Sequence, residues 1–290
     1  MLGRETRHLR GNHLIIAHPG TRSPLQACSL SVASPETLRA TDLVKRFGEH
    51  EVVHGVSLSV QAGEVVGLLG PNGAGKTTIL RMLAGILSPT HGQVFINGQD
   101  VREQTLAAKR RIGFLSGDTQ LYRRLTPREV LLYFGRLYEI PEDKLARRTE
   151  QLIAELEMTA FADQQCGSLS AGQKQRANIA RAFVHEPDLL ILDEPTTALD
   201  VISGQFIVET IRRERAAGRA ILFSTHIMSE AEYLCDRILL LHEGRLIDAG
   251  TLPELLARTG ARNLTDAFLR HARPVTQPVA PAPSAAPGSS

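Results

Sequence analysis

The stretch Gly70-Pro71-Asn72-Gly73-Ala74-Gly75-Lys76-Thr77-Thr78 decides the fold of this 290-residue chain. It matches the phosphate-binding pattern G-x-x-x-x-G-K-[ST], whose fixed positions are Gly70, Gly75, Lys76 and Thr77. The apolar run Glu64–Leu69 before it predicts a buried parallel strand, and the apolar spacing of Thr78–Ala84 after it predicts a helix. This order of strand, loop and helix is the structural context that the pattern requires.

The residue types of the loop suit a triphosphate. Gly73 and Gly75 let the backbone N–H groups wrap the phosphates, because glycine has no side chain in the way. The following helix turns its positive N-terminal end towards the anion. Lys76 is predicted to place its charge on the β- and γ-phosphates, and the Thr77 hydroxyl to bind Mg²⁺. The alternative, a Gly-rich turn with an exposed lysine, agrees less well with the flanking strand and helix.

Composition is that of an ordinary globular protein, with 42% hydrophobic and 22% charged residues. A formal net charge of +2 is too close to neutral to indicate nucleic acid as a partner. Cys28, Cys166 and Cys235 are scattered without metal-ligand spacing, which is typical of reduced thiols in a cytoplasmic protein. No apolar stretch approaches the roughly 18 residues of a transmembrane helix, so we expect any membrane role to act through a partner.

The two ends of the chain differ from the middle. Residues 1–36 mix arginine and histidine with proline and glycine, which favours a disordered extension over a targeting peptide. An upstream start of translation is another interpretation, since no internal Met precedes Gly70. Residues 259–273 are expected to form a short C-terminal helix, and the Pro/Ala/Ser-rich residues 274–290 a disordered tail.

Strands and helices alternate in the body of the chain. Residues Leu38–Gln61 alternate apolar and polar types, with turn signals near Gly48 and Gly55, which predicts antiparallel strands. Helical patterns then dominate from Thr126 to Val184. The elements expected after them are a strand at Leu189–Leu192, a helix from about Val201 to Ala217 closed by Gly218, a strand at Ala220–Phe223 and a hairpin at Arg237–Asp248. This order predicts an α/β nucleotide domain with a parallel sheet and an all-helical insertion between its halves.

One helix of the insertion has a clear start signal. Thr126-Pro127-Arg128-Glu129 forms a capping box with proline at the first helical position. The buried face of this helix is expected to consist of four apolar side chains, namely Val130, Leu131, Phe134 and Leu137.

A second acidic element favours hydrolysis of the nucleotide. The apolar run Leu189–Leu192 ends in two carboxylates, Asp193 and Glu194. Asp193 is predicted to hold the metal, and Glu194 to polarise the attacking water as a general base. Successive strand residues point to opposite faces, but at a strand terminus both side chains can turn towards the phosphates. The alternative is two solvated residues at a strand exit.

From about Leu38 to Arg258 the chain resembles the nucleotide-binding subunit of ATP-binding cassette (ABC) transporters. Separate motifs carry the resemblance in the family's order: the signature-like Leu169-Ser170-Ala171-Gly172-Gln173, the D-loop-like Pro195–Asp200, Ser224-Thr225-His226 after a strand, and Phe47 after Lys45-Arg46. The resemblance implies an ABC-type P-loop NTPase at residues 37–258, with an N-terminal antiparallel β subdomain and a helical insertion at about 116–187.

The resemblance also implies roles for these residues. Ser170, Gly172 and Gln173 are expected to contact the ATP held by the phosphate loop of a second copy, so that two cassettes sandwich each nucleotide. Asp200 is expected at the same interface between the two cassettes, although it also suits the N-cap of the next helix. His226 is expected to contact the γ-phosphate, although a lone histidine is more often a packed or surface residue. Phe47 is expected to stack on adenine rather than serve as a core residue.

The chain departs from the family pattern at one position. The family normally places a glutamine at the entry to the helical insertion, where it touches Mg²⁺ and water, but here Gly117 occupies that position. Gln120 is near but out of register, and Asp118 is a candidate to bind the metal through water. A narrower resemblance, in the segments Phe114–Thr119, Asn178–Arg181 and Phe223–Glu230, is to the ATPase subunit of NatA-type sodium-export systems.

These observations predict an ATP-hydrolysing subunit with ATP and Mg²⁺ as cofactors. It is expected to pair with a second cassette, to energise export of Na⁺ or a small molecule through a polytopic permease docked near residues 115–135, and to use no nucleic acid. Its expected place is the cytoplasm, on the inner face of the cell membrane. The alternatives are a soluble ABC ATPase that acts on ribosomes or DNA, and a switch protein that binds ATP without turnover.

Overall fold

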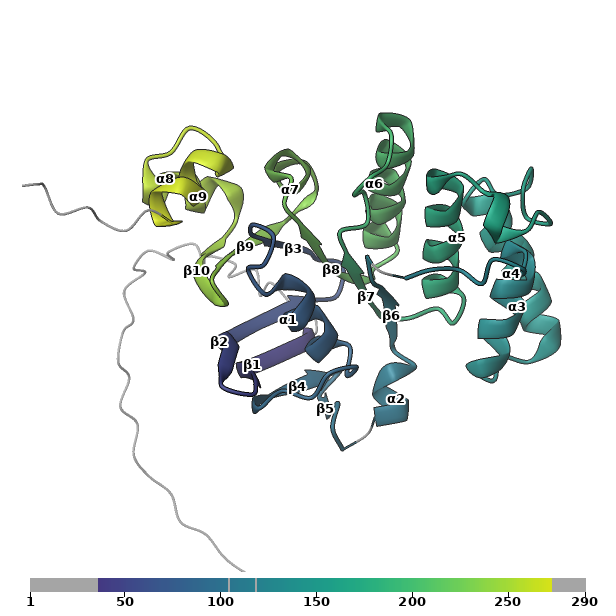
Figure 1. The fold of residues 1–290 in the computed structure, drawn as a ribbon, viewed down its shortest axis with the longest axis horizontal. Coiled ribbons are helices and arrows are strands. Elements are labelled where there is room, and N and C mark those ends of the chain that lie inside the picture. The colour runs from purple at the N-terminus through teal and green to yellow at the C-terminus, as the bar shows by residue number, and fades with distance from the viewer. Residues whose placement is uncertain (1–35, 104, 118, 273–290) are drawn as a thin grey trace, which may run out of the picture. The chain divides into compact units, whose positions relative to one another are not determined.

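The computed structural model describes residues 36–103, 105–117 and 119–272 (Figure 1). All of them belong to one compact unit, Ser34–Ser290. The predicted N-terminal extension apart from Glu36, the predicted tail at 274–290 and the candidate metal ligand Asp118 lie outside these ranges. In the described ranges no helix combines the length and the apolar character needed to cross a bilayer.

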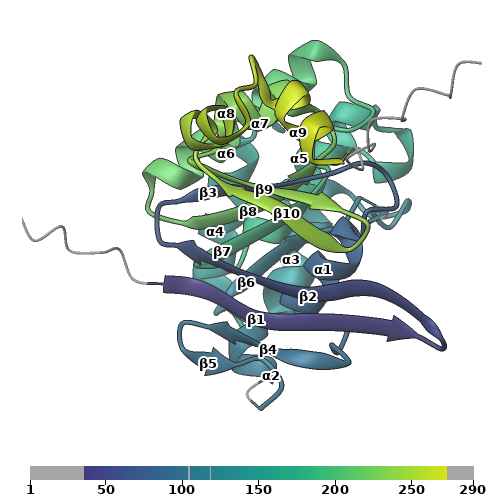
Figure 2. The ribbon, with the colours of Figure 1, turned by 90° about the vertical axis from the view of Figure 1, so that its left-hand side faces the viewer.

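The strands form two sheets, as the order of motifs predicts. Their bounds are β1 Glu36–Phe47, β2 His50–Gln61, β3 Val65–Leu69, β4 His91–Ile96, β5 Gln99–Asp100, β6 Ile112–Leu115, β7 Leu189–Asp193, β8 Ala220–Thr225, β9 Arg237–His242 and β10 Arg245–Gly250. One sheet is antiparallel with the order β2-β1-β4-β5, and the other has the order β10-β9-β3-β8-β7-β6. In the second sheet only the β9–β10 pair is antiparallel (Figure 2). This confirms a mainly parallel core sheet with an N-terminal antiparallel sheet.

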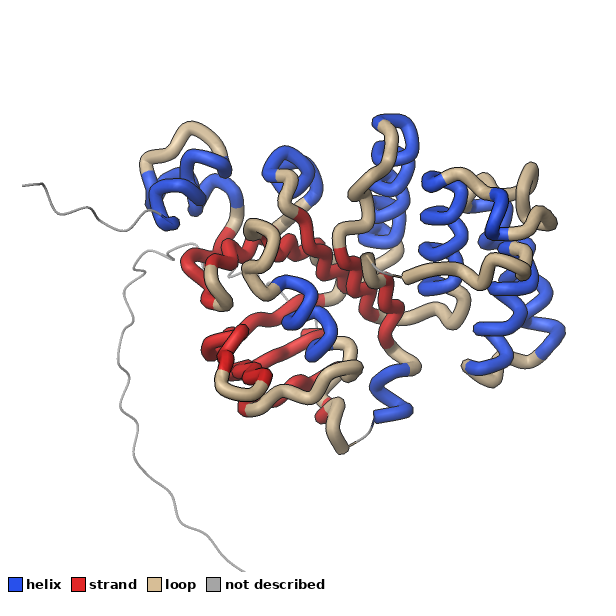
Figure 3. The backbone as a smooth tube through the Cα atoms, in the orientation of Figure 1, coloured by secondary structure: helices blue, strands red, loops and turns tan. Residues whose placement is uncertain are grey.

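The helices pack around these sheets. Their bounds are α1 Lys76–Leu83, α2 Thr105–Lys109, α3 Pro127–Leu137, α4 Glu142–Glu155, α5 Ala171–Phe183, α6 Val201–Ala216, α7 Met228–Leu234, α8 Leu252–Thr259 and α9 Leu264–Ala272. Helix α1 lies between the two sheets, and α3, α4 and α5 form a group beyond the β6 edge of the core sheet (Figure 3). The helical insertion therefore lies next to β6, the strand from which the chain enters it.

Burial explains the sequence character of the central strands. Every residue of β3, β7 and β8 is buried, so these strands show no alternation and are apolar up to the polar residues Asp193, Ser224 and Thr225 at the ends of β7 and β8. One apolar cluster fills the space between the two sheets around α1, and another joins α3, α4 and α5 to the core sheet. A third holds α8 and α9 against β9. The carboxyl ends of β3, β7 and β8 are thus held by packing on both faces.

Several local predictions are confirmed and others are wrong. Thr126 forms the predicted capping box with Glu129, but Leu137 is 60% exposed because it lies at the last residue of α3. Gly55 does not make a turn; it lies inside β2 with a φ of 72°, next to a shift in the strand register. Helix α8 was not expected, although Thr251 and Glu254 form a capping box at its start.

Candidate nucleotide-binding site

The phosphate loop follows β3 and opens helix α1. Gly73 and Gly75 have φ values of 82° and 101°, in the left-handed region where a side chain would be strained. Gly75 is the N-cap of α1, and no side chain caps this end, so the first N–H groups of the helix remain available to an anion. The loop and the helix start line a cavity of about 320 Å³, whose lining residues are Val52, Asn72, Gly73, Gly75, Lys76, Thr77, Thr78 and Glu194.

Lys76 is held in place by the loop it belongs to. Its side chain is 6% exposed, and Nζ donates to the carbonyl oxygens of Gly70 at 2.8 Å and Pro71 at 3.2 Å. The same ammonium group lies 3.3 Å from Oε1 of Glu194. Lys76 therefore contacts both the loop and the carboxylate that the sequence assigns to catalysis.

The two predicted carboxylates lie at the end of β7 and line one cavity with Thr77. This cavity, of about 390 Å³, is lined by Thr77, Gly117, Gln175, Asp193, Glu194, Thr197 and Ala198. Asp193 is buried and accepts a hydrogen bond from the Ser224 hydroxyl, with 2.6 Å between the oxygens. Glu194 has a φ of 47°, so the backbone reverses at this residue. The reversal allows neighbouring strand residues to face the same cavity instead of opposite sides of the sheet.

Glu194 sits among groups that favour its ionised form. Thr197 donates a hydrogen bond to Oε2 at 2.9 Å, and Nδ1 of His226 lies 3.2 Å from the same oxygen. Burial opposes ionisation, but the hydrogen bonds from Thr197 and Lys76 and the nearby positive charges outweigh it, so the pKa of Glu194 is lowered. An ionised carboxylate beside the phosphate loop is suited to accept a proton from water.

The signature and D-loop residues lie at helix starts outside these two cavities. Ser170 caps α5 and forms a capping box with Gln173, and Asp200 caps α6 by accepting a hydrogen bond from the Ser203 N–H at 2.9 Å. Gly172 lies against α6, where an added Cβ would come within 2.4 Å of the Ser203 hydroxyl oxygen. The described residues that line the phosphate cavities do not include Ser170, Gly172, Gln173 or Asp200.

Phe47 ends β1 and is 51% exposed. The Lys45 ammonium group lies 5.2 Å from the centre of its ring. Phe47 is also absent from the linings of the two phosphate cavities within the described ranges. An exposed ring at a strand end is compatible with stacking on a planar ligand, and it is not the buried core residue of the alternative interpretation.

Sequence reasoning missed four residues of the site. Val52 lines the phosphate cavity, and Ser224, Thr197 and Gln175 contact the carboxylate segment. Thr197 and Ser224 stand inside motifs that were already identified, and Gln175 lies two residues after the signature-like motif, so their polar character was a usable signal. Val52 carried no such signal, because its position depends on how β2 crosses the loop.

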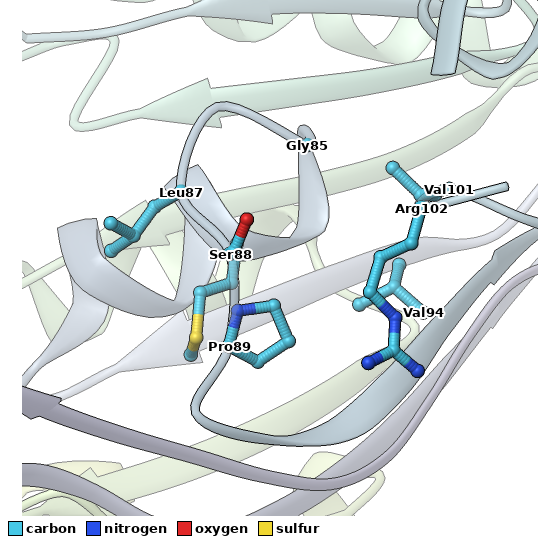
Figure 4. A pocket seen from close by; sticks show the side chains of 8 residues that line it. Gly85, Leu87, Ser88, Pro89, Val94, Val101 and Arg102 are labelled. Atoms are coloured by element: carbon cyan, nitrogen blue, oxygen red, sulfur yellow. The ribbon is translucent and has the colours of Figure 1, made fainter. Parts of the chain in front are cut away.

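A further cavity of about 280 Å³ lies beyond the end of α1 (Figure 4). Leu87, Pro89, Val94 and Val101 give it an apolar lining, and Arg102 lies across the space from Pro89. It contains none of the predicted site residues, so it is separate from the phosphate cavities.

Comparison with known proteins agrees with this geometry. The family model described as ABC transporter matches residues 53–197. The chain is 41% identical over 234 residues to the ABC transporter ATP-binding protein NatA of Bacillus subtilis (strain 168), covering 79% of this chain and 95% of that protein. It is 44% identical over 206 residues to the Nod factor export ATP-binding protein I of Burkholderia lata, covering 71% of this chain and 68% of that protein.

Solved structures extend the similarity to the fold. A structure described as the ATP-binding subunit of an ABC transporter superposes with a TM-score of 0.76 at 31% identity, covering 82% of this chain and all of that one. A dimeric post-hydrolysis ATP-binding cassette bound to ADP and Pi superposes with a TM-score of 0.67 at 28% identity, covering 74% and 98%. The chain therefore belongs to the ABC transporter family, as one of its ATP-binding, ATP-hydrolysing subunits.

Proposed function

We propose that Glu194 is the general base for hydrolysis of ATP bound at the phosphate loop. The observation that carries this assignment is the position of its carboxylate, 3.3 Å from Lys76 and 3.2 Å from His226 at the edge of the phosphate cavity. In the proposed site, Lys76 places its positive charge on the phosphates and the backbone N–H groups of residues 72–78 donate hydrogen bonds to them. Glu194 takes the proton of the attacking water, and His226 contacts the γ-phosphate.

The oxygen groups beside Glu194 fit a magnesium ion. Thr77 and Asp193 line the same cavity, and their hydroxyl and carboxylate oxygens are ligands that Mg²⁺ prefers. Within the described ranges no group of three or more His, Cys, Asp or Glu side chains could hold a metal. This agrees with Mg²⁺, which binds through one or two protein groups together with substrate phosphates. The ion would neutralise charge that develops on the transferred phosphoryl group.

A second copy of the chain completes the site in our proposal. Ser170, Gly172 and Gln173 stand at the start of α5, whose N–H groups suit a phosphate, yet these residues do not line the cavities of their own chain. We likewise assign Asp200, at the start of α6, to the interface between the two copies. We assign the exposed ring of Phe47 to stacking on adenine. The dimeric state of the similar cassette bound to ADP and Pi supports this arrangement.

The transport role follows from the relatives. NatA and the Nod factor export proteins are ATP-binding proteins, and the name of the latter specifies export. We assign to this chain the export of Na⁺ or a small molecule through a polytopic permease, from the inner face of the cell membrane. The permease is assigned to the surface of residues 115–135, where Tyr122 is 58% exposed.

Phosphate release by the purified full-length chain tests the assignment. Replacement Glu194→Gln keeps the shape but removes the base, so we expect turnover to fall by about 10²-fold or more while ATP still binds. Lys76→Ala should instead abolish ATP binding, because its charge contacts the phosphates. Near-normal turnover by Glu194→Gln would refute the assignment of the base.

A further inference from the structure

Helix α5 makes a hydrogen bond to the catalytic segment. The Nε2 atom of Gln175 donates a hydrogen bond to the Pro195 carbonyl oxygen, 2.5 Å away. Pro195 directly follows Glu194, so this bond acts on the backbone that orients the carboxylate. Gln175 also lines the cavity that Thr77, Asp193 and Glu194 share.

The segment from Glu194 to Ala198 needs such support. Its first and last residues, Glu194 and Ala198, have positive φ values of 47° and 62°, which non-glycine residues adopt only when the surroundings hold them. Inside the segment, the Thr197 N–H donates to the Glu194 carbonyl and the Thr197 hydroxyl donates to the Glu194 carboxylate. Gln175 adds a bond from outside the segment, and its donor comes from a different element of the fold.

Gly117 contributes no side chain to the cavity, whereas Gln175 does. Gly117 lines the same cavity without a side chain, and a Cβ added there would meet only the Asp193 carbonyl oxygen, at an ordinary 3.5 Å. The loop after β6 therefore leaves room in the cavity at this position. The carboxamide of Gln175 enters the same cavity from α5.

We infer that Gln175 is a positioning residue that ties the helical insertion to the catalytic carboxylate. Helix α5 belongs to the insertion, whereas Glu194 belongs to the core sheet through β7. A rotation of α5 relative to β7 must move the Pro195 carbonyl or break this bond, and either event changes the direction of the Glu194 side chain. The inference rests on the proposed role of Glu194 as the base.

Steady-state kinetics of the full-length chain test this role. Gln175→Met keeps the length of the side chain but removes the donor, and we expect kcat to fall by about tenfold. The KM for ATP and the dissociation constant of ATP should stay within about twofold, because no phosphate contact is lost. The matched control is Gln151→Met on α4, where the exposed glutamine donates a hydrogen bond to Glu155, and its kcat should equal that of the wild type.

A second variant separates positioning from folding. In Gln175→Glu a carboxylate faces the Pro195 carbonyl, and only its protonated form can donate the hydrogen bond. At pH 7 its carboxylate is ionised, so its kcat should fall at least as far as that of Gln175→Met, while the KM for ATP stays within about twofold. A wild-type kcat for Gln175→Met or for Gln175→Glu would overturn the inference, as would an equal loss of ATP affinity. If Glu194→Gln, measured alongside, keeps its turnover, the base assignment itself is wrong.

Discussion

The catalytic carboxylate depends on the conformation of a single residue. Glu194 follows the buried strand β7 with a left-handed backbone, and this reversal places it in the same cavity as Asp193. The sequence predicted that both carboxylates turn towards the phosphates, because they stand at a strand terminus. It could not predict the hydrogen bonds from Thr197 and Ser224, because those bonds depend on the path of the loop and on the register of β7 with β8.

The hydrogen bond from Thr197 predicts a pH effect. The lowered pKa of Glu194 means that the base of the wild type stays ionised down to pH values below the ordinary glutamate range. Thr197→Val removes the donor without changing the shape, so the pKa should rise and the acid limb of the kcat profile should move to higher pH. At pH 7 the base is ionised in both proteins, and kcat should stay within about threefold.

Rates of phosphate release from pH 3.5 to pH 8 measure this difference. The comparison with the wild type cancels titrations that both proteins share. Superimposable acid limbs would show that Thr197 does not act on the ionisation of Glu194.

At the scale of elements, the start of α5 is packed closely against the start of α6. An alanine at position 172 would bring its Cβ within 2.4 Å of the Ser203 hydroxyl oxygen, and that hydroxyl donates to the capping carboxylate of Asp200. Gly172→Ala should therefore lower the free energy of unfolding by about 1–3 kcal/mol, because the Ser203 hydroxyl must give up its hydrogen bond to Asp200 or the two helix starts must move apart. Chemical denaturation measures this loss.

Helix α6 supplies the control for Gly172→Ala. Gly204→Ala lies one residue after Ser203, and its added Cβ would meet nothing within 4 Å. This variant should be neutral or more stable by up to about 1 kcal/mol, because alanine favours the helix. Adding Ser203→Gly to Gly172→Ala should recover part of the lost stability; equal losses in the single and double variants would argue against the contact.

His185, just beyond α5, joins three elements and should make stability depend on pH. Its ring stacks on Tyr138 with centroids 3.8 Å apart, and Nε2 donates to the Ile112 carbonyl. Nδ1 is buried and has no hydrogen-bond partner among the residues that the structure describes. Burial lowers the pKa of His185 from 6.5 to about 4, so the folded protein keeps the neutral ring. Below pH 6.5 the unfolded chain binds the proton more readily, so stability falls as the pH drops from about 6.5 to about 4.

Denaturant titrations at pH 7 and pH 5 test this dependence. The free energy of unfolding should fall by about 2 kcal/mol more in the wild type than in His185→Phe, which keeps an aromatic ring but cannot titrate. The phenylalanine variant also loses the bond to Ile112, so its stability at pH 7 should be lower by about 1 kcal/mol. An identical pH dependence in the two proteins would contradict the burial of a neutral His185.

Elements with strong local signals were predictable from the sequence, and those set by tertiary contacts were not. The apolar runs of β3, β7 and β8 predicted buried strands, and the capping box at Thr126 predicted the start of α3. Gly55 gave the same signal as a turn glycine, but pairing with β1 keeps it inside β2. Leu137 fits the apolar period of α3, but no element covers it at the end of the helix.

At the scale of the whole molecule, the two halves of the proposed ATP site stand on different parts of one chain. The phosphate loop, Asp193, Glu194 and His226 are brought together at the carboxyl ends of the core strands. Ser170, Gly172, Gln173 and Asp200 mark the starts of α5 and α6 and do not line that site. The phosphate-loop pattern and the two carboxylates predicted most of the first group, and the family resemblance implied His226, the second group and the place of that group at the nucleotide of a second copy.

The mass of the Glu194→Gln chain in solution with Mg-ATP shows whether two copies share the ATP site. Size-exclusion chromatography with light scattering should give the mass of two chains with ATP and of one chain, 31.7 kDa, without nucleotide. Adding Ser170→Arg, which places a bulky cation at the start of α5, should return the ATP-bound protein to a single chain while it still binds ATP. A wild-type protein that remains a single chain with ATP while it hydrolyses at its full rate would contradict a site shared between two copies.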